Sequence, residues 1–206
     1  FLTRGVLPKI FSIKESNGIN RAHLQYLGHS LNEMERNTAI QHLEYLLDIF
    51  FDAKEYGSIL NVDNYNWELL SHFVEDFRIE GQISLESIGI EDSQEKLRQI
   101  IVIGEAMAQK YDIVVTNPPY MGSNGLGSNL SEYVKKNYPE AKSDMFACFI
   151  EKGFSYAKNN GFVAMITMES WMFLSSFEKM REKIIRTKNI RNMVHMPYLG
   201  KGGTSL

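Results

Sequence analysis

Cysteine is nearly absent from this sequence, and long apolar runs are missing altogether. The 206 residues contain one cysteine, Cys148, which excludes an intrachain disulfide and any cysteine-rich zinc site. The longest apolar runs, such as residues 99–104 and 162–166, are far shorter than the roughly 20 residues that a transmembrane helix needs. We therefore expect a protein of the reducing cytoplasm, without a membrane segment.

Metal-ligand spacing and closely spaced glycines are also lacking in most of the chain. The five histidines show no His-x-x-x-His or His/Glu pattern, so we expect no metal site. Before residue 117 the closest glycines, Gly81 and Gly89, are eight residues apart. That stretch therefore contains no glycine-rich loop of the kind that binds nucleotide cofactors.

Charge is distributed unevenly along the chain. The net charge of −3 does not by itself indicate nucleic-acid binding. Residues 131–206 nevertheless hold 12 Lys and Arg against 7 Asp and Glu, whereas residues 1–130 hold 10 against 18. Such asymmetry can mark a nucleic-acid surface. An alternative of equal weight is a solvated helix surface around residues 179–188.

Length and hydrophobic periodicity predict an α/β fold with one substantial core. Residues 1–92 are expected to form a mainly helical upstream region, and residues 93–206 a strand–helix core of the same domain. Because apolar strands and helices alternate in the second part, we expect a mostly parallel, doubly wound sheet. The predicted helices cover residues 21–56, 66–77, 93–109, 131–137, 143–158 and 170–186, and residues 81–90 form a connector. The predicted strands cover residues 10–13, 111–116, 162–167 and 190–196.

The most informative motif is Asn117-Pro118-Pro119-Tyr120, directly behind the predicted strand 111–116. In parallel sheets, ligands bind beyond the carboxyl ends of the strands. Two prolines fix two φ angles and remove two backbone donors, which leaves the carbonyls of Asn117 and Pro118 free to accept from a ligand. Together with the Asn117 side-chain oxygen they suit an exocyclic amino group. Tyr120 offers a flat face on which a planar base can stack.

The segment from Asp112 to Gly122 resembles the catalytic motif of S-adenosylmethionine-dependent N6-adenine DNA methyltransferases. It is most similar to the large adenine methyltransferases of BREX phage-defence systems and of type IIG restriction–modification enzymes. Three further stretches are similar to that family, namely residues 53–60, 142–146 and 161–167. The resemblance implies a Rossmann-like methyltransferase fold with S-adenosylmethionine as cofactor.

The same resemblance implies roles for five residues. Asn117 and the Pro118 carbonyl would hold the N6 amine of an adenine flipped out of double-stranded DNA. Pro119 would fix the loop, and Tyr120 would stack on the base. Asp144, at the start of the next helix, would contact the cofactor or the base. Other subunits of a defence system are the implied protein partners.

The chain departs from the family pattern in its glycines. Such enzymes bind the cofactor with a glycine-rich loop after the first strand, and we expect that strand and loop to lie outside this chain. Residues 122–127 are expected to form a mobile substrate loop instead, and residues 200–203 a loop that enters the next motif. The chain alone is therefore expected to bind S-adenosylmethionine poorly and to be inactive.

Two other functions use similar features. Methylation of an RNA base or of a protein glutamine relies on the same motif chemistry. A binding module that kept the methyltransferase fold and lost catalysis would also contain these strands and helices, although an intact Asn117–Tyr120 motif argues against it.

Overall fold

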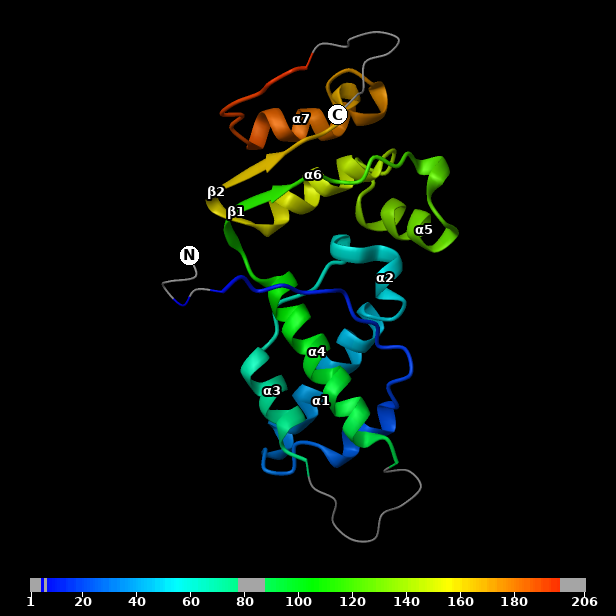
Figure 1. Ribbon diagram of the computed structural model, residues 1–206, viewed down its shortest axis with the longest axis vertical. Helices are drawn as coiled ribbons and strands as arrows, with labels where there is room; N and C mark the ends of the chain where they lie inside the picture. Colours follow the sequence, from blue (N-terminus) through cyan, green and yellow to red (C-terminus); the bar gives the residue numbers. More distant parts are fainter. Residues whose placement is uncertain (1–4, 6, 78–87, 197–206) are drawn as a thin grey trace. The chain divides into compact units, whose positions relative to one another are not determined.

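The computed structural model describes residues 5, 7–77 and 88–196. The chain divides into two compact units, residues 1–111 and 112–206. Each unit has its own core and is described by itself (Figure 1).

Unit 1 is helical and is built around three packed helices. They are α1 (Glu33–Ile49), α3 (Trp67–Glu75) and α4 (Ile90–Ala108), and each contacts the other two. Shorter elements complete the unit, namely η2 (Arg21–Tyr26), α2 (Ala53–Tyr56) and η3 (Gly57–Ile59). Fully buried side chains at helical spacing form the core, among them Leu43, Leu46, Phe73, Leu97 and Ile100. Burial of these apolar faces is what stabilises helices of this length.

Asparagine side chains fix where the helices of unit 1 begin. The Asn32 side chain accepts from the Glu35 amide at 2.9 Å, and the Glu35 carboxylate accepts from the Asn32 amide in return. Asn66 caps α3 by accepting from the Leu69 amide at 3.0 Å. These caps satisfy amides that have no partner inside the helix.

Unit 2 combines two strands with helices. β1 (Tyr111–Thr116), whose first residue closes unit 1, pairs with β2 (Ala157–Met165), and the two strand arrows run in the same direction (Figure 1). The helices are α5 (Ser128–Asn137), α6 (Met145–Tyr156) and α7 (Glu178–Thr187), with short turns η5 (Ser123–Gly125), η6 (Glu169–Met172) and η7 (Ser175–Phe177). α6 packs on β2, and its buried Phe146 ring lies 5.7 Å from the Phe177 ring at the start of α7. This arrangement is a mixed α/β unit, as predicted.

The structure corrects several predicted boundaries. The predicted helix 21–56 is three separate helices, and the predicted helix 170–186 begins as 3-10 turns and becomes α-helical only at Glu178. α4 starts at Ile90, so Ser93 does not cap it; the Ser93 hydroxyl lies 2.8 Å from His23 Nδ1 instead. α4 itself packs with unit 1, although the sequence groups it with the strand–helix core.

Two predicted strands are wrong. Residues 10–13 have no strand structure, and Ile10 is 88% exposed. Residues 190–196 are also without strand structure. Their alternating apolar residues fit a strand pattern, but among the described residues no neighbouring strand supplies hydrogen bonds to them. The predicted connector 81–90 falls mainly, and the loop 200–203 entirely, outside the described residues.

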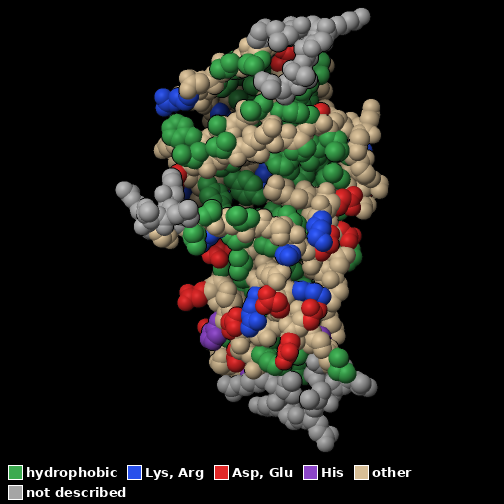
Figure 2. Space-filling model, in the orientation of Figure 1, with side chains coloured by type: hydrophobic (Ala, Val, Ile, Leu, Met, Phe, Trp, Pro, Cys, Tyr) green, Lys and Arg blue, Asp and Glu red, His purple; other side chains and the backbone are tan. Residues whose placement is uncertain are grey.

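A central strand of a doubly wound sheet is buried on both faces, but β1 is not. Ile113 is 63% exposed and Val115 is 72% exposed, and hydrophobic side chains are visible at the surface over the strands of unit 2 (Figure 2). In the part of the chain that the structure describes, the sheet has two strands. α6 packs on β2, and apolar side chains such as Ile113, Val115 and Phe162 stay exposed.

Candidate active site

The Asn117–Tyr120 motif leaves the carboxyl end of β1 without regular secondary structure. Pro118 is buried, whereas Asn117, Pro119 and Tyr120 are exposed. β2 ends next to β1 at Met165. Because the strands are parallel, the motif and Ile166 follow strand ends at the same edge of the sheet.

The Tyr120 hydroxyl connects the two strand ends. Its oxygen lies 3.0 Å from Asn117 Oδ1 and 3.1 Å from the Ile166 carbonyl oxygen. The hydroxyl has one proton, so it donates fully to only one of these acceptors at a time. When it donates to Ile166, both lone pairs of Asn117 Oδ1 are available to another donor.

The Tyr120 ring contacts one neighbouring aromatic ring and is open to solvent. It meets the buried Phe146 ring with a centroid distance of 6.4 Å and an interplanar angle of 60°, a favourable edge-to-face geometry. Tyr120 remains 42% exposed, so a planar group can approach it. The sequence did not identify Phe146 and Ile166 as its partners; the rule that parallel strands end at one edge could have indicated Ile166.

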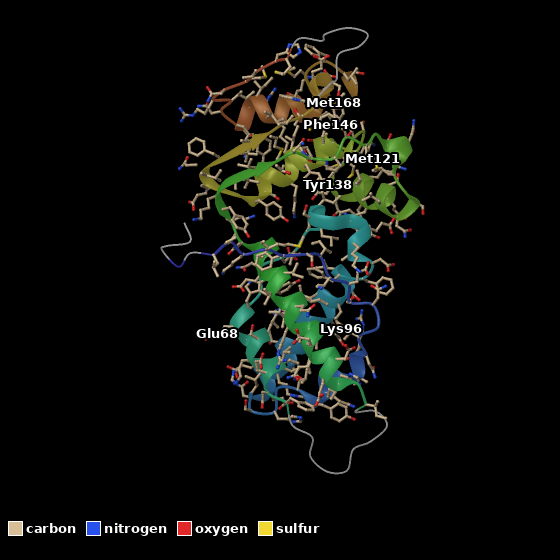
Figure 3. The ribbon with its side chains drawn as sticks, in the orientation of Figure 1. Glu68, Lys96, Met121, Tyr138, Phe146 and Met168 are labelled. Atoms are coloured by element: carbon tan, nitrogen blue, oxygen red, sulfur yellow. The ribbon has the colours of Figure 1, made fainter. Side chains whose placement is uncertain are left out.

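Asp144 lies at the start of α6 and beside the residue that follows Tyr120. Its Oδ1 accepts from the Phe146 amide at 3.3 Å, which caps α6, and from the Met121 amide at 3.1 Å. Met121 and Phe146 are both labelled in Figure 3. The structure therefore places Asp144 next to the motif and occupies one of its oxygens with protein donors.

The glycines after the motif do not form a cradle for a nucleotide cofactor. Ser123–Gly125 is a single 3-10 turn, and a Cβ on Gly125 would lie 3.1 Å from Met121 Cγ. Gly122 and Gly127 have φ angles of −64° and −61°, which other residues adopt readily. None of Gly122, Gly125 and Gly127 has the positive φ angle that requires glycine in a tight loop.

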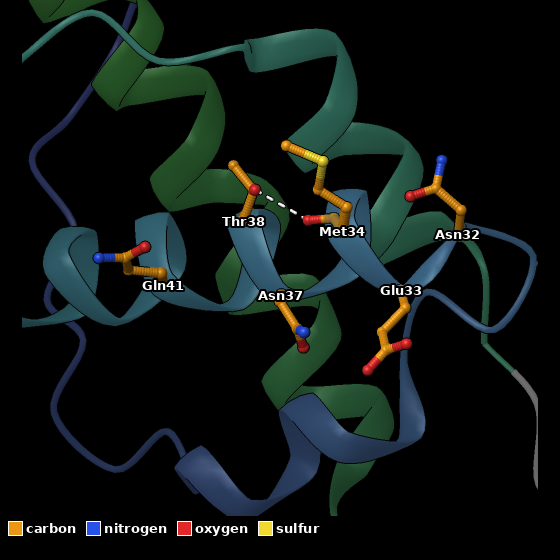
Figure 4. Close-up of a pocket in the computed structure, with 6 residues that line it drawn as sticks. All are labelled: Asn32, Glu33, Met34, Asn37, Thr38 and Gln41. Carbon is orange, nitrogen blue, oxygen red and sulfur yellow. Dashed lines mark hydrogen bonds between the residues drawn. The ribbon is translucent and has the colours of Figure 1, made fainter.

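The hollows found in unit 1 contain none of the motif residues. A shallow groove of about 640 Å³ runs along α1 and is lined by Asn32, Glu33, Met34, Asn37, Thr38 and Gln41 (Figure 4). A second hollow of about 340 Å³ is lined by residues that include His42, Tyr45 and Tyr65. No cluster of His, Cys, Asp and Glu able to hold a metal ion occurs among the described residues.

Cys148 is a core residue and not a nucleophile. Its side chain is fully buried on α6, and its Sγ donates to the Ala141 carbonyl at 3.5 Å. Burial raises the pKa of this thiol to about 12. A thiol that stays protonated at neutral pH cannot attack a substrate.

The basic stretch 179–188 is engaged with protein groups. Lys183 pairs with Glu151 at 3.3 Å, and Arg186 pairs with Glu182 at 2.6 Å. Arg181 donates to the carbonyls of Trp171 and Leu174. These contacts favour the solvated helix surface over a free cationic face. On the helices of unit 1, side chains of both charges are interspersed (Figure 2).

The described geometry defines a class of protein. An α/β unit carries a polar and aromatic site at the end of a parallel strand, with an asparagine oxygen and a tyrosine ring side by side. No helix among the described residues has the length and hydropathy to cross a membrane. In α/β proteins, ligands bind at this position, beyond the carboxyl ends of parallel strands.

Comparison with known proteins identifies the family. The model of the Eco57I restriction-modification methylase family matches residues 23–200, so the chain belongs to this family. It is 39% identical over 153 residues to the adenine-specific methyltransferase BrxX of Escherichia coli O9:H4 (strain HS). It is 40% identical over 153 residues to the adenine-specific methyltransferase PglX of Lacticaseibacillus casei (strain Zhang).

The similar regions are short compared with the relatives. Both cover 73% of this chain, but only 12% of BrxX and 13% of PglX. The chain thus spans about an eighth of the length of these relatives. The resemblance to adenine methyltransferases that the sequence predicts is confirmed.

Proposed function

We propose that this chain carries the amine-binding part of an enzyme that methylates the N6 position of adenine in DNA. The observation that supports the proposal is the placement of Asn117–Tyr120 at a parallel strand end, with the Tyr120 hydroxyl within hydrogen-bonding distance of both Asn117 Oδ1 and the Ile166 carbonyl. BrxX and PglX are named as adenine-specific. Those names favour adenine over a glutamine side chain as the methyl acceptor.

In this proposal the protein orients the amine for attack. The two N–H groups of N6 would donate to Asn117 Oδ1 and to the Pro118 carbonyl, which leaves the nitrogen lone pair free to form the bond to the methyl group. The S–CH3 bond of the donor would break as the N6–CH3 bond forms, and one N6 proton would be released to water. Tyr120 stacks on the flipped adenine and donates its own proton to Ile166. Pro119 limits the backbone freedom of the loop. Orientation of this kind supplies catalysis without a covalent intermediate.

The methyl donor in the proposal is S-adenosylmethionine, which supplies an electrophilic methyl group. The proposed fold is that of a Rossmann-like methyltransferase domain, with this chain as a part of it. Double-stranded DNA with a flipped adenine is the proposed substrate. Other subunits of a restriction or phage-defence system are the proposed protein partners.

The test is Asn117→Ala in the full-length protein. Removing one positioned acceptor at the reacting centre is expected to lower methyl transfer about 10²–10³-fold, without loss of folded protein. The readout is N6-methyladenine in host DNA, measured by sequencing of modified bases.

Asn159→Ala is the matched control. Asn159 is an exposed asparagine near the opposite end of β2, and its substitution should leave methylation unchanged. Normal adenine methylation by Asn117→Ala would refute the assignment. Methylated RNA or protein in place of DNA would redirect it to another substrate.

A further inference from the structure

Asp144 makes a contact that a simple helix cap does not need. An N-cap carboxylate accepts from amides of its own first turn, as Asp144 Oδ1 does with the Phe146 amide. The same oxygen also accepts from the Met121 amide, 23 residues earlier in the chain. One side-chain atom therefore joins the start of α6 to the residue directly after Tyr120.

Backbone pairing surrounds this contact. The Met145 amide donates to the Met121 carbonyl at 3.0 Å, and the Ser123 amide donates to the Ser143 carbonyl at 3.0 Å. Gly122 and Asp144 form an antiparallel bridge between these two bonds. Residues 121–123 are thus laid against residues 143–145, and the Asp144 side chain secures the end nearest Tyr120.

Tyr120 is consequently fixed from two directions. Its side chain is held by the Ile166 carbonyl, Asn117 Oδ1 and the Phe146 ring. Its main chain on the C-terminal side is held through Met121 by Asp144. Freeing the Met121 amide would let the loop, and with it the Tyr120 ring, shift relative to β1.

We propose that Asp144 is a positioning residue. It holds the Met121 amide and so keeps Tyr120 and Asn117 in position to bind the amine. The proposal rests on the function proposed above, and it differs from the role of cofactor ligand expected from the sequence. The Met121 contact needs an acceptor oxygen at Oδ1 and does not need a negative charge. The substitution Asp144→Asn retains that oxygen, whereas Asp144→Ala removes it.

The experiment compares Asp144→Ala, Asp144→Asn and wild type in the full-length protein. Asp144→Ala is expected to lower kcat about tenfold, because the loss of one hydrogen bond at Met121 lets Tyr120 move out of position. The KM for S-adenosylmethionine should stay within about twofold, because no cofactor contact is lost. Asp144→Asn should keep kcat within about threefold of wild type.

Asn66→Ala is the matched control for loss of a cap. Asn66 caps α3 in unit 1, and its substitution should leave kcat and KM unchanged. If Asp144 binds the cofactor through its charge, both Asp144 variants will raise the KM for S-adenosylmethionine, and that result overturns the proposal. An Asp144→Ala enzyme with normal kcat also overturns it.

Hydrogen exchange tests the contact without relying on activity. In Asp144→Ala the Met121 amide should exchange at least about tenfold faster than in wild type, and in Asp144→Asn it should stay protected. Unchanged protection in Asp144→Ala refutes the positioning role even in a protein that methylates DNA. A wild-type protein that does not methylate adenine refutes the proposed function, and the exchange rates still decide whether Asp144 holds Met121.

Discussion

At the scale of single residues, Tyr120 has two separable contributions. Its ring offers a stacking face, and its hydroxyl contacts both Asn117 of the motif and the Ile166 carbonyl after β2. Tyr120→Phe keeps the face and removes the hydroxyl. Because one neutral hydrogen bond contributes about 0.5–1.5 kcal/mol, we expect methyl transfer to fall by about 2- to 10-fold. Tyr120→Ala should cost considerably more. Steady-state kcat/KM on an adenine-containing duplex measures both effects.

Tyr45→Phe serves as the control for Tyr120→Phe. Tyr45 is 52% exposed on α1, in the unit that does not contain the motif, so its substitution should leave kcat/KM unchanged. A Tyr120→Phe enzyme as impaired as Tyr120→Ala would mean that the hydroxyl, and not the ring face, is the main contribution. That outcome would contradict the stacking role.

The residues of the candidate site have local sequence signals, whereas their contacts do not. The motif and Asp144 could be found because prolines, an asparagine and a helix start leave local signals. The hydrogen bond from Tyr120 to Ile166 joins residues 46 positions apart, and it depends on the pairing of β1 with β2. Such contacts depend on three-dimensional packing, which local patterns do not encode.

At the scale of elements, Gly28 limits how the segment before α1 meets α3. Its φ is +70°, and a Cβ there would overlap the buried Phe73 ring. Gly28→Ala therefore combines a left-handed backbone cost of about 1–2 kcal/mol with an overpacking cost of about 1–3 kcal/mol. We expect the free energy of unfolding of unit 1 to fall by about 2–5 kcal/mol, the sum of these two costs, measured by urea denaturation.

Gly18→Ala separates the two costs. Gly18 also has a positive φ, of +78°, but a Cβ there would have no atom within 4 Å. Its substitution should show the backbone cost alone, about 1–2 kcal/mol. Equal losses for Gly28→Ala and Gly18→Ala would contradict the packing of Gly28 on Phe73.

The elements themselves were predicted with uneven success. Strand 111–116 and the helices near residues 66–77 and 143–158 follow clear apolar periodicity, and the structure confirms them within a few residues. The failed strands, at residues 10–13 and 190–196, also contain regularly spaced apolar residues. Among the described residues, however, they have no strand to pair with. Alternating apolar residues indicate that a segment could present one apolar face as a strand. Whether the strand forms depends on a neighbouring strand to pair with, which the local pattern does not reveal.

At the scale of the whole molecule, the chain consists of two units, and different contacts stabilise their cores. Unit 1 is stabilised by helix packing, and unit 2 by α6 on the strands and by the Phe146–Phe177 contact. The chain has two tryptophans, Trp67 in unit 1 and Trp171 in unit 2. In a Trp67→Phe background, the fluorescence of Trp171 therefore follows unit 2 alone.

High pH should weaken unit 2 through its single cysteine. Burial raises the pKa of the Cys148 thiol to about 12, against about 8.5 in an unfolded chain. Between these values only the unfolded state releases the proton, so the free energy of unfolding falls as pH rises above about 9, by up to about 1.4 kcal/mol per pH unit. Urea unfolding followed by Trp171 fluorescence from about pH 8 to 10 measures this slope. Cys148→Ala should reduce this slope. An equal slope in that variant would contradict the burial of Cys148. Ready alkylation of the native thiol near pH 8 would contradict it as well.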